Sequence, residues 1–76
     1  MISELETVVV NKAVPEIGIV PGDIGVVIHI YRDKKAVEVE FVLGDDSAAG
    51  VATLSMEDIR PLKSREILHA RELNSA

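Results

Sequence analysis

The sequence contains no cysteine and no tryptophan, and its only aromatic residues are Tyr31 and Phe41. Without cysteine, the chain has no disulfide, no thiolate metal site and no cysteine nucleophile. This composition suits a reducing compartment, and we expect the cytoplasm of a bacterium. Because only two aromatic side chains are present, the hydrophobic core has to consist mainly of valine, isoleucine and leucine.

Long hydrophobic runs are also missing. Apolar stretches such as residues 26–28 are far shorter than the roughly 20 residues of a membrane-spanning helix. Residues 1–6 lack the basic region and the apolar stretch of a secretory signal peptide. We therefore expect neither secretion nor a membrane span.

Positive charge is scarce, because 8 Lys and Arg stand against 13 Asp and Glu and give a formal net charge of −5. Only residues 32–35 form a basic cluster, and Asp33 interrupts it. Nucleic-acid affinity comes largely from cations that displace counterions from phosphates. The charge balance therefore disfavours nucleic acid as the partner.

The length of 76 residues allows one small domain with a single core. The hydrophobic fraction of 47% excludes a chain that is disordered throughout. A domain of this size has no second lobe that could form a deep interdomain cleft. We therefore do not expect an enzyme.

Short β-branched runs dominate the chain and predict an antiparallel β structure. Residues 36–42 alternate strictly, with Val37, Val39 and Phe41 on one face and Glu38 and Glu40 on the other. The two glutamates therefore face water or a partner. The five predicted strands are residues 7–11, 26–31, 36–42, 51–54 and 59–62.

Turn signals separate these strands. Proline and glycine at residues 21–22 predict a type II turn, and Gly25 is expected to help the chain turn sharply into the sheet. Ser55 is a predicted cap for one helical turn at residues 56–58, and Pro61 has to lie at an edge or an end of a sheet. We predict a small five-stranded barrel over residues 1–62, because closure removes exposed sheet edges.

Residues 63–76 differ from the rest and form a predicted tail. Ser64 is followed by good helix formers, so we predict a short helix that ends near Leu73 and then a disordered end. Ile67, Leu68 and Leu73 are apolar residues that the barrel pattern does not need. We expect this helix to dock on another protein or on a second copy of the chain.

The segments at residues 8–10, 22–27, 37–41 and 58–62 resemble a family of small bacterial domains of unknown function. The resemblance covers roughly residues 4–62 and implies an SH3-like barrel. More distantly, the chain is similar to the SH3-like subunit S of NAD(P)H dehydrogenase and to KOW modules. The resemblance implies no established activity.

No motif in the sequence points to catalysis, and we predict no catalytic, metal-binding or cofactor-binding residue. His29 lies within a strand without an implied acid or nucleophile beside it, and we interpret it as a solvent-facing residue. His69 lies between two glutamates, but three or four converging ligands are needed for a metal site. Asp45 and Asp46 lack the pattern of a calcium loop.

By elimination, we predict a non-catalytic protein–protein interaction module, either an accessory subunit or an antitoxin-like partner of a larger bacterial protein. It would bind through an open barrel edge or through the tail, and it could form homo-oligomers in the same way. The alternative is a KOW-like RNA-binding or ribosome-associated module, with Tyr31 as the stacking platform and cations beside it. The candidate partner-binding residues are Tyr31, Arg32, Glu38, Glu40, Ile67, Leu68 and Leu73.

Overall fold

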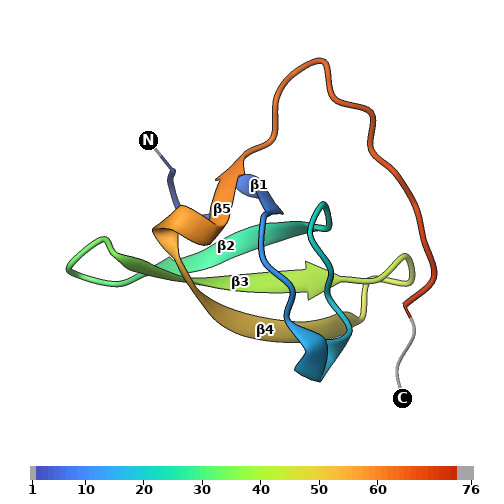
Figure 1. Cartoon of the computed structure of the whole chain (residues 1–76), viewed down its shortest axis with the longest axis horizontal. Helices are drawn as coiled ribbons and strands as arrows, with labels where there is room; N and C mark the ends of the chain where they lie inside the picture. Colours follow the sequence, from blue (N-terminus) through green and yellow to red (C-terminus); the bar gives the residue numbers. More distant parts are fainter. Residues whose placement is uncertain (1, 74–76) are drawn as a thin grey trace.

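Five antiparallel strands form a single sheet in the computed structural model, which describes residues 2–73. The strands are β1 (Thr7–Val10), β2 (Ile24–Ile30), β3 (Ala36–Val42), β4 (Ala48–Ser55) and β5 (Ile59–Pro61), joined with two 3₁₀ turns, η1 (Pro15–Ile17) and η2 (Met56–Asp58). Their order in the sheet is β4-β3-β2-β1-β5. Figure 1 shows β1 and β5 running steeply across β2, β3 and β4, so the sheet is strongly curved. The predicted mainly β, five-stranded antiparallel fold is confirmed.

The core enclosed by this sheet is mainly aliphatic, as the composition predicts. The alternation predicted for β3 is confirmed, because Val37, Val39 and Phe41 are buried while Glu38 and Glu40 are only partly buried. The buried cluster consists of Val8, Val10, Ile19, Val27, Val37, Val39, Phe41, Ala52, Leu54 and Ile59. Phe41 is the only aromatic residue in it.

Strand β4 begins three residues earlier than the sequence predicts. Ala48 pairs with Val42 and Gly50 pairs with Phe41, with a register irregularity between the two pairs. Alanine and glycine have weak strand propensity, so the pattern placed them in a loop. Pairing with β3 decides their conformation instead.

The turn between the first two strands is formed as predicted at Gly22, whose φ is +97°. Gly25 has a different role from the one predicted. It lies inside β2, and a Cβ atom there would be 2.5 Å from Cγ1 of Val39 and 2.9 Å from Cε1 of Phe41. Gly25 therefore serves the close packing of β2 on the core and not the turn.

The connection between β4 and β5 confirms two further predictions. Ser55 caps η2, since its Oγ accepts a hydrogen bond from the Glu57 N–H at 3.3 Å and its own N–H donates to Asp58 Oδ2 at 3.3 Å. Pro61 is the last residue of β5, which is an edge strand of the sheet. Its missing N–H therefore disturbs no interior strand pairing.

The helix predicted over residues 64–73 is not formed. Residues 62–73 contain only a turn at Ser64 and Arg65 and otherwise run in an extended path from β5 around the molecule, as Figure 1 shows. Glu66 and Arg71 form ion pairs with the sheet region and hold the extended path, in which Ile67 and Leu68 are 88% and 67% exposed. The predicted disordered end falls partly on residues 74–76, which lie outside the described residues.

Within residues 2–73, none of the helical segments has the length and apolar character required to cross a membrane.

Candidate functional site

The outer face of the sheet is the surface of β2, β3 and β4 that points away from the core. In the strand register, Glu38 lies between His29 on β2 and Thr53 on β4. The Tyr31 hydroxyl donates to Glu38 Oε2 at 3.0 Å, and Thr53 Oγ1 donates to the same oxygen at 3.4 Å. The His29 and Tyr31 rings meet edge to face with centroids 4.9 Å apart. These four residues, the Glu38 cluster, thus join side chains of three strands.

The chemistry of the Glu38 cluster is that of a fixed hydrogen-bond acceptor. The hydrogen bond to Glu38 raises the pKa of Tyr31 above its ordinary value, so the phenol keeps its proton and acts as a donor. His29 Nδ1 lies 3.7 Å from Glu4 Oε2, and both side chains are more than half exposed, so this contact contributes little. The cluster presents an oriented carboxylate beside an aromatic ring.

A second carboxylate on the outer face has apolar neighbours. Glu40 lies opposite Val26 on β2 and Val51 on β4, and Val42 follows it on the same face of β3. Val42 and Val51 are each 48% exposed, although valine is usually buried. We call these four residues the Glu40 platform. A carboxylate among exposed methyl groups suits the aliphatic stem and charged head of a lysine or arginine.

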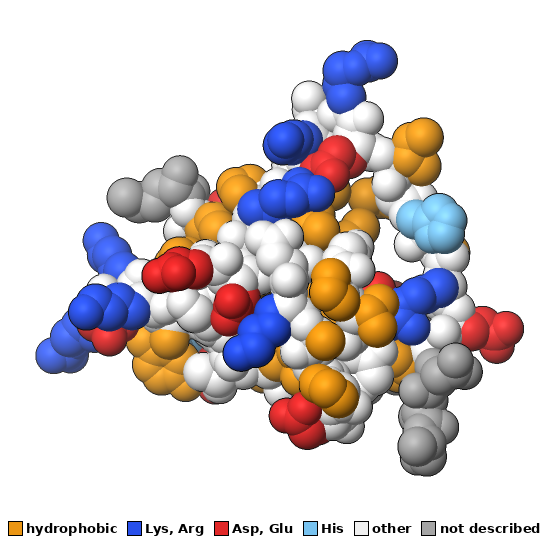
Figure 2. Space-filling view, in the orientation of Figure 1, with side chains coloured by type: hydrophobic (Ala, Val, Ile, Leu, Met, Phe, Trp, Pro, Cys, Tyr) orange, Lys and Arg blue, Asp and Glu red, His pale blue; other side chains and the backbone are white. Residues whose placement is uncertain are grey.

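A groove of about 820 Å³ adjoins the Glu38 cluster at the hairpin between β2 and β3. Tyr31 belongs to both surfaces, and Arg32 and Lys34 add positive charge to the groove. Figure 2 shows lysine and arginine side chains projecting together at this hairpin. The lining residues are Ile2, Ser3, Glu4, Ile30, Tyr31, Arg32, Lys34, Met56 and Pro61.

The structure brings together some of the predicted partner-binding residues and separates others. Tyr31 and Glu38 are in direct contact, Glu40 lies on the same face, and Arg32 lines the adjoining groove. The sequence does not indicate the contribution of Thr53, because it depends on the register between β3 and β4. In the tail, Ile67 and Leu68 are exposed, whereas Leu73 packs against the core.

Among residues 2–73, no group of three or more histidine, aspartate and glutamate side chains is arranged to hold a metal ion.

A protein-family model described as a domain of unknown function (DUF4926) matches residues 4–61, which is more than half of the chain. The chain belongs to the DUF4926 family. The match includes every strand of the DUF4926 sheet and ends at Pro61, so the tail lies outside the matched residues. Comparisons with curated proteins and with solved structures found no match.

The tail is attached to the DUF4926 domain by two ion pairs, of which the first is close to β5. The Arg60 guanidinium donates to both carboxylate oxygens of Glu66 at 2.7 Å, and the Lys63 N–H donates to Glu66 Oε1 at 2.7 Å. The Arg60 hydrogen bonds, with help from the Lys63 N–H, lower the pKa of Glu66 from 4.5 to about 2. This pair fixes the direction in which the tail leaves the sheet.

Replacing Arg60 with glutamine is expected to raise the pKa of Glu66 from about 2 toward 4.5, because the main stabiliser of the carboxylate is lost. A ¹³C NMR titration of the Glu66 side-chain carboxyl measures the midpoint directly. Since the folded-state pKa is depressed, the pair stabilises the fold fully above pH 4.5 and progressively less as the pH falls toward 2. The matched control is Arg65→Gln, next to Glu66, in which the titration midpoint of Glu66 should stay unchanged. An equal shift of the Glu66 midpoint in both variants would contradict the assignment of its low pKa to Arg60.

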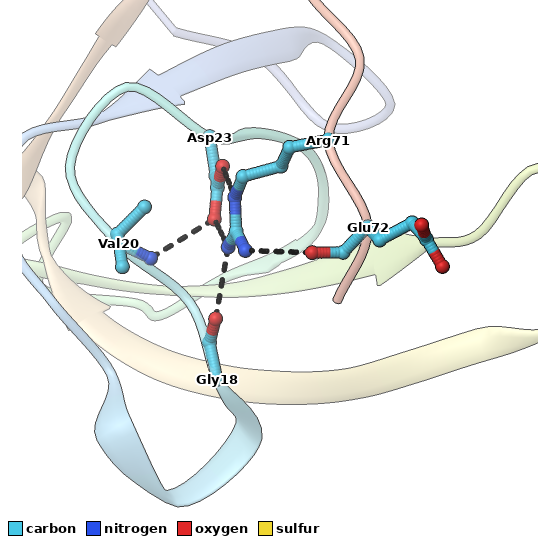
Figure 3. A network of polar contacts seen from close by, with 5 residues as sticks. All are labelled: Gly18, Val20, Asp23, Arg71 and Glu72. Atoms are coloured by element: carbon cyan, nitrogen blue, oxygen red, sulfur yellow. Dashed lines mark hydrogen bonds and ion pairs between the residues drawn. The ribbon is translucent and has the colours of Figure 1, made fainter. Parts of the chain in front are cut away.

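The second ion pair of the tail joins it to the turn that precedes β2 and is drawn in Figure 3. Arg71 Nε donates to Asp23 Oδ1 at 2.9 Å, and a terminal nitrogen of the same guanidinium pairs with Asp23 Oδ2. That nitrogen also donates to the Gly18 carbonyl oxygen at 2.8 Å. The Arg71 hydrogen bonds hold the pKa of Asp23 below its ordinary value. Residues 48 positions apart in the sequence are therefore joined.

Proposed function

We propose that this chain is a non-catalytic protein-interaction module that binds a cationic surface of a partner protein through the outer face of β2, β3 and β4. The observation that carries this proposal is the Glu40 platform, in which a carboxylate lies beside the exposed side chains of Val42 and Val51 and the partly buried Val26. Apolar contact with methyl groups supplies affinity, and the carboxylate selects a positive charge.

Charge supports the same proposal. Two carboxylates, Glu38 and Glu40, lie two residues apart on one strand face, and the whole chain has a formal net charge of −5. Tyr31 and Thr53 orient the Glu38 carboxylate, so little side-chain freedom is lost when a partner binds it. An acidic face of this kind attracts lysine-rich and arginine-rich surfaces and repels phosphates.

The role we propose is that of an SH3-like accessory subunit or antitoxin-like partner of a larger protein in the bacterial cytoplasm. Support for the SH3-like barrel comes from the strand order β4-β3-β2-β1-β5, the strong curvature of the sheet and the 3₁₀ turn between the last two strands. The size of the domain and its acidic outer face are consistent with a partner that is neutralised or stabilised by contact alone.

The double variant Glu40→Lys/Val51→Lys is expected to weaken partner binding by at least about tenfold, because it places two positive charges against a cationic surface. Tagged chains are compared by affinity purification from the native host with quantitative mass spectrometry. The control is Glu16→Lys on η1, which changes the charge by +2, against +3 for the double variant, at an exposed residue away from the outer face. Partners that are retained equally by both variants would contradict the proposal, and circular dichroism verifies that both are folded.

A second candidate function, binding of single-stranded RNA, is favoured by one observation only. Tyr31 lies beside Arg32 and Lys34 in the hairpin groove, which combines an aromatic ring with cations. Glu4 in the groove and Glu38 on the Tyr31 hydroxyl oppose a phosphate chain.

A mobility shift with single-stranded RNA at low salt separates the two functions. We expect no shifted band for the natural chain, because carboxylates adjoin the aromatic ring that would stack on the bases. A salt-dependent shift that disappears in Arg32→Glu/Lys34→Glu would favour RNA binding over protein binding.

A further inference from the structure

The contact between the end of the tail and the sheet region forms a defined site. We call it the latch site and define it by the Gly18 carbonyl, the Asp23 carboxylate and the apolar residues Ile19, Ile24, Phe41 and Ala49. The tail occupies it with Arg71, which binds the polar groups, and with Leu73, which packs against the core. The occupant is therefore an extended Arg-Glu-Leu segment.

The polar half of the latch site is held in place without the tail. Asp23 follows the turn at Gly22, and its Oδ2 accepts a hydrogen bond from the Val20 N–H at 2.9 Å. The Asp23 carbonyl accepts from the Val10 N–H at 2.9 Å, which ties the turn to β1. With Arg71 bound, the Asp23 side chain is 17% exposed. All these groups belong to residues 4–61, the part that matches the DUF4926 family, whereas the occupant lies outside that match.

The tail fills this site poorly. Between its two ion pairs, Ile67 and Leu68 are 88% and 67% exposed, so the intervening chain buries little apolar surface. A cavity of about 270 Å³ remains between the tail and the sheet, with Phe41 on one side and His69 and Leu73 on the other. A different segment with a larger side chain would therefore bury more of the apolar surface that lines this cavity.

We infer that the latch site is a peptide-binding site for an extended segment of a partner protein that carries an arginine and, two residues later, an aliphatic residue. The chain's own Arg71-Glu72-Leu73 is an internal occupant that this segment displaces. Neither Glu38 nor Glu40 lines the cavity at the latch site, although Val42 belongs both to the cavity lining and to the Glu40 platform. The inference therefore goes beyond the proposed function and is tested with variants that leave Val42 in place.

Arginine is specified over lysine by geometry. One guanidinium binds both oxygens of Asp23 and the Gly18 carbonyl at the same time. A lysine ammonium is a point charge without this planar fork, and it cannot reproduce the two parallel contacts. The Asp23 carboxylate is oriented by the Val20 N–H and is 17% exposed with Arg71 bound, so the difference is larger than it would be at a fully exposed residue.

The internal occupant competes with any external segment, because it is tethered at a high effective concentration. The apparent affinity for an added peptide is reduced in proportion to the small fraction of molecules in which the tail is released. The double variant Arg71→Ala/Leu73→Ala removes both anchors of the tail in the full chain. It is therefore expected to expose the site to added peptide.

The probe is a fluorescent peptide with the sequence of residues 66–75, measured by anisotropy, with NMR shifts at Gly18, Asp23 and Phe41 as the positional readout. We expect this peptide to bind Arg71→Ala/Leu73→Ala at least about tenfold more tightly than the natural chain, since competition is removed. The same peptide with lysine in place of its arginine is expected to bind at least about tenfold more weakly. The matched control Arg65→Ala/Leu68→Ala changes exposed tail residues and should bind as the natural chain does.

Adding Asp23→Asn to Arg71→Ala/Leu73→Ala keeps an acceptor for the Val20 N–H and removes the charge, so peptide binding should be lost while the fold is retained. Equal binding with and without Asp23→Asn, or no gain on releasing the tail, would overturn the inference. Light scattering measures the oligomeric state and so tests whether the bound segment comes from a partner protein or from a second copy of the chain. A monomer is expected, whereas a dimer that dissociates in Arg71→Ala/Leu73→Ala would assign the site to a second copy and overturn the partner-protein assignment.

The outer-face variant Glu40→Lys/Val51→Lys separates the two surfaces when it is combined with Arg71→Ala/Leu73→Ala. We expect this combined variant to retain peptide binding at the latch site, whatever happens to its binding of the cationic partner.

Discussion

Replacing Gly25 with alanine is expected to lower the melting temperature by about 10–20 °C, which corresponds to roughly 2–3 kcal/mol for a domain of this size. The added Cβ would lie 2.5 Å from Cγ1 of Val39 and 3.1 Å from the backbone oxygen of Glu40. Both atoms belong to β3, which pairs with β2 along most of its length. The two strands would have to separate to make room. Differential scanning calorimetry measures the effect.

The matched control is Gly44→Ala, where an added Cβ has no atom within 4 Å. Its melting temperature should stay within a few degrees of the natural chain. The origin of the Gly25 effect is tested by repeating the substitution in a Val39→Ala background, which removes the nearest methyl group. The cost of Gly25→Ala should be smaller there. An identical cost in both backgrounds would show that contact with Val39 is not its cause.

The sequence predicts those features of the fold that depend on near neighbours. The alternation over residues 36–42 assigns the buried and exposed faces of β3, because strand side chains alternate strictly. Proline before Gly22 predicts the turn between β1 and β2, and Ser55 predicts the N-terminal cap of η2. Each of these signals acts over two or three residues. These features do not require knowledge of which strands pair.

The features that the sequence does not predict depend on residues that are distant along the chain. Local sequence predicts a turn role for Gly25, because nothing nearby in the chain reveals that Val39 and Phe41 will lie against it. Helix propensity predicts a helix for the tail, but Arg71 binds Asp23, 48 positions away, and holds the tail in an extended path. Helix formation by a short segment stabilises it too weakly to compete with such contacts.

The same distinction applies to the outer face. Glu38 and Glu40 could be assigned to a water- or partner-facing surface from the alternation alone. Their neighbours could not, because Thr53 and Val51 are placed beside them by the register between β3 and β4. The sequence therefore indicates the acidic residues of the candidate site but not the hydroxyl and methyl groups that define what it can bind.

Replacing Phe41 with alanine is expected to reduce the free energy of unfolding by about 3–5 kcal/mol. Phe41 is the largest side chain in the buried cluster, and its removal leaves a cavity between β2, β3 and the tail. A domain of 76 residues is typically stable by roughly 4–11 kcal/mol, so this substitution removes a large part of the total. Urea denaturation followed by circular dichroism gives the difference between the two chains.

Tyr31, the other aromatic residue of the chain, provides the matched comparison for the loss of stability at Phe41. Tyr31 is 37% exposed and makes one side-chain hydrogen bond, to Glu38, so Tyr31→Ala should cost about 1 kcal/mol or less. Equal losses at the two positions would show that Tyr31 supports the fold as Phe41 does. A small loss at Tyr31 together with weaker partner binding would mean that the chain uses one aromatic ring to hold its core and the other for contact at the surface.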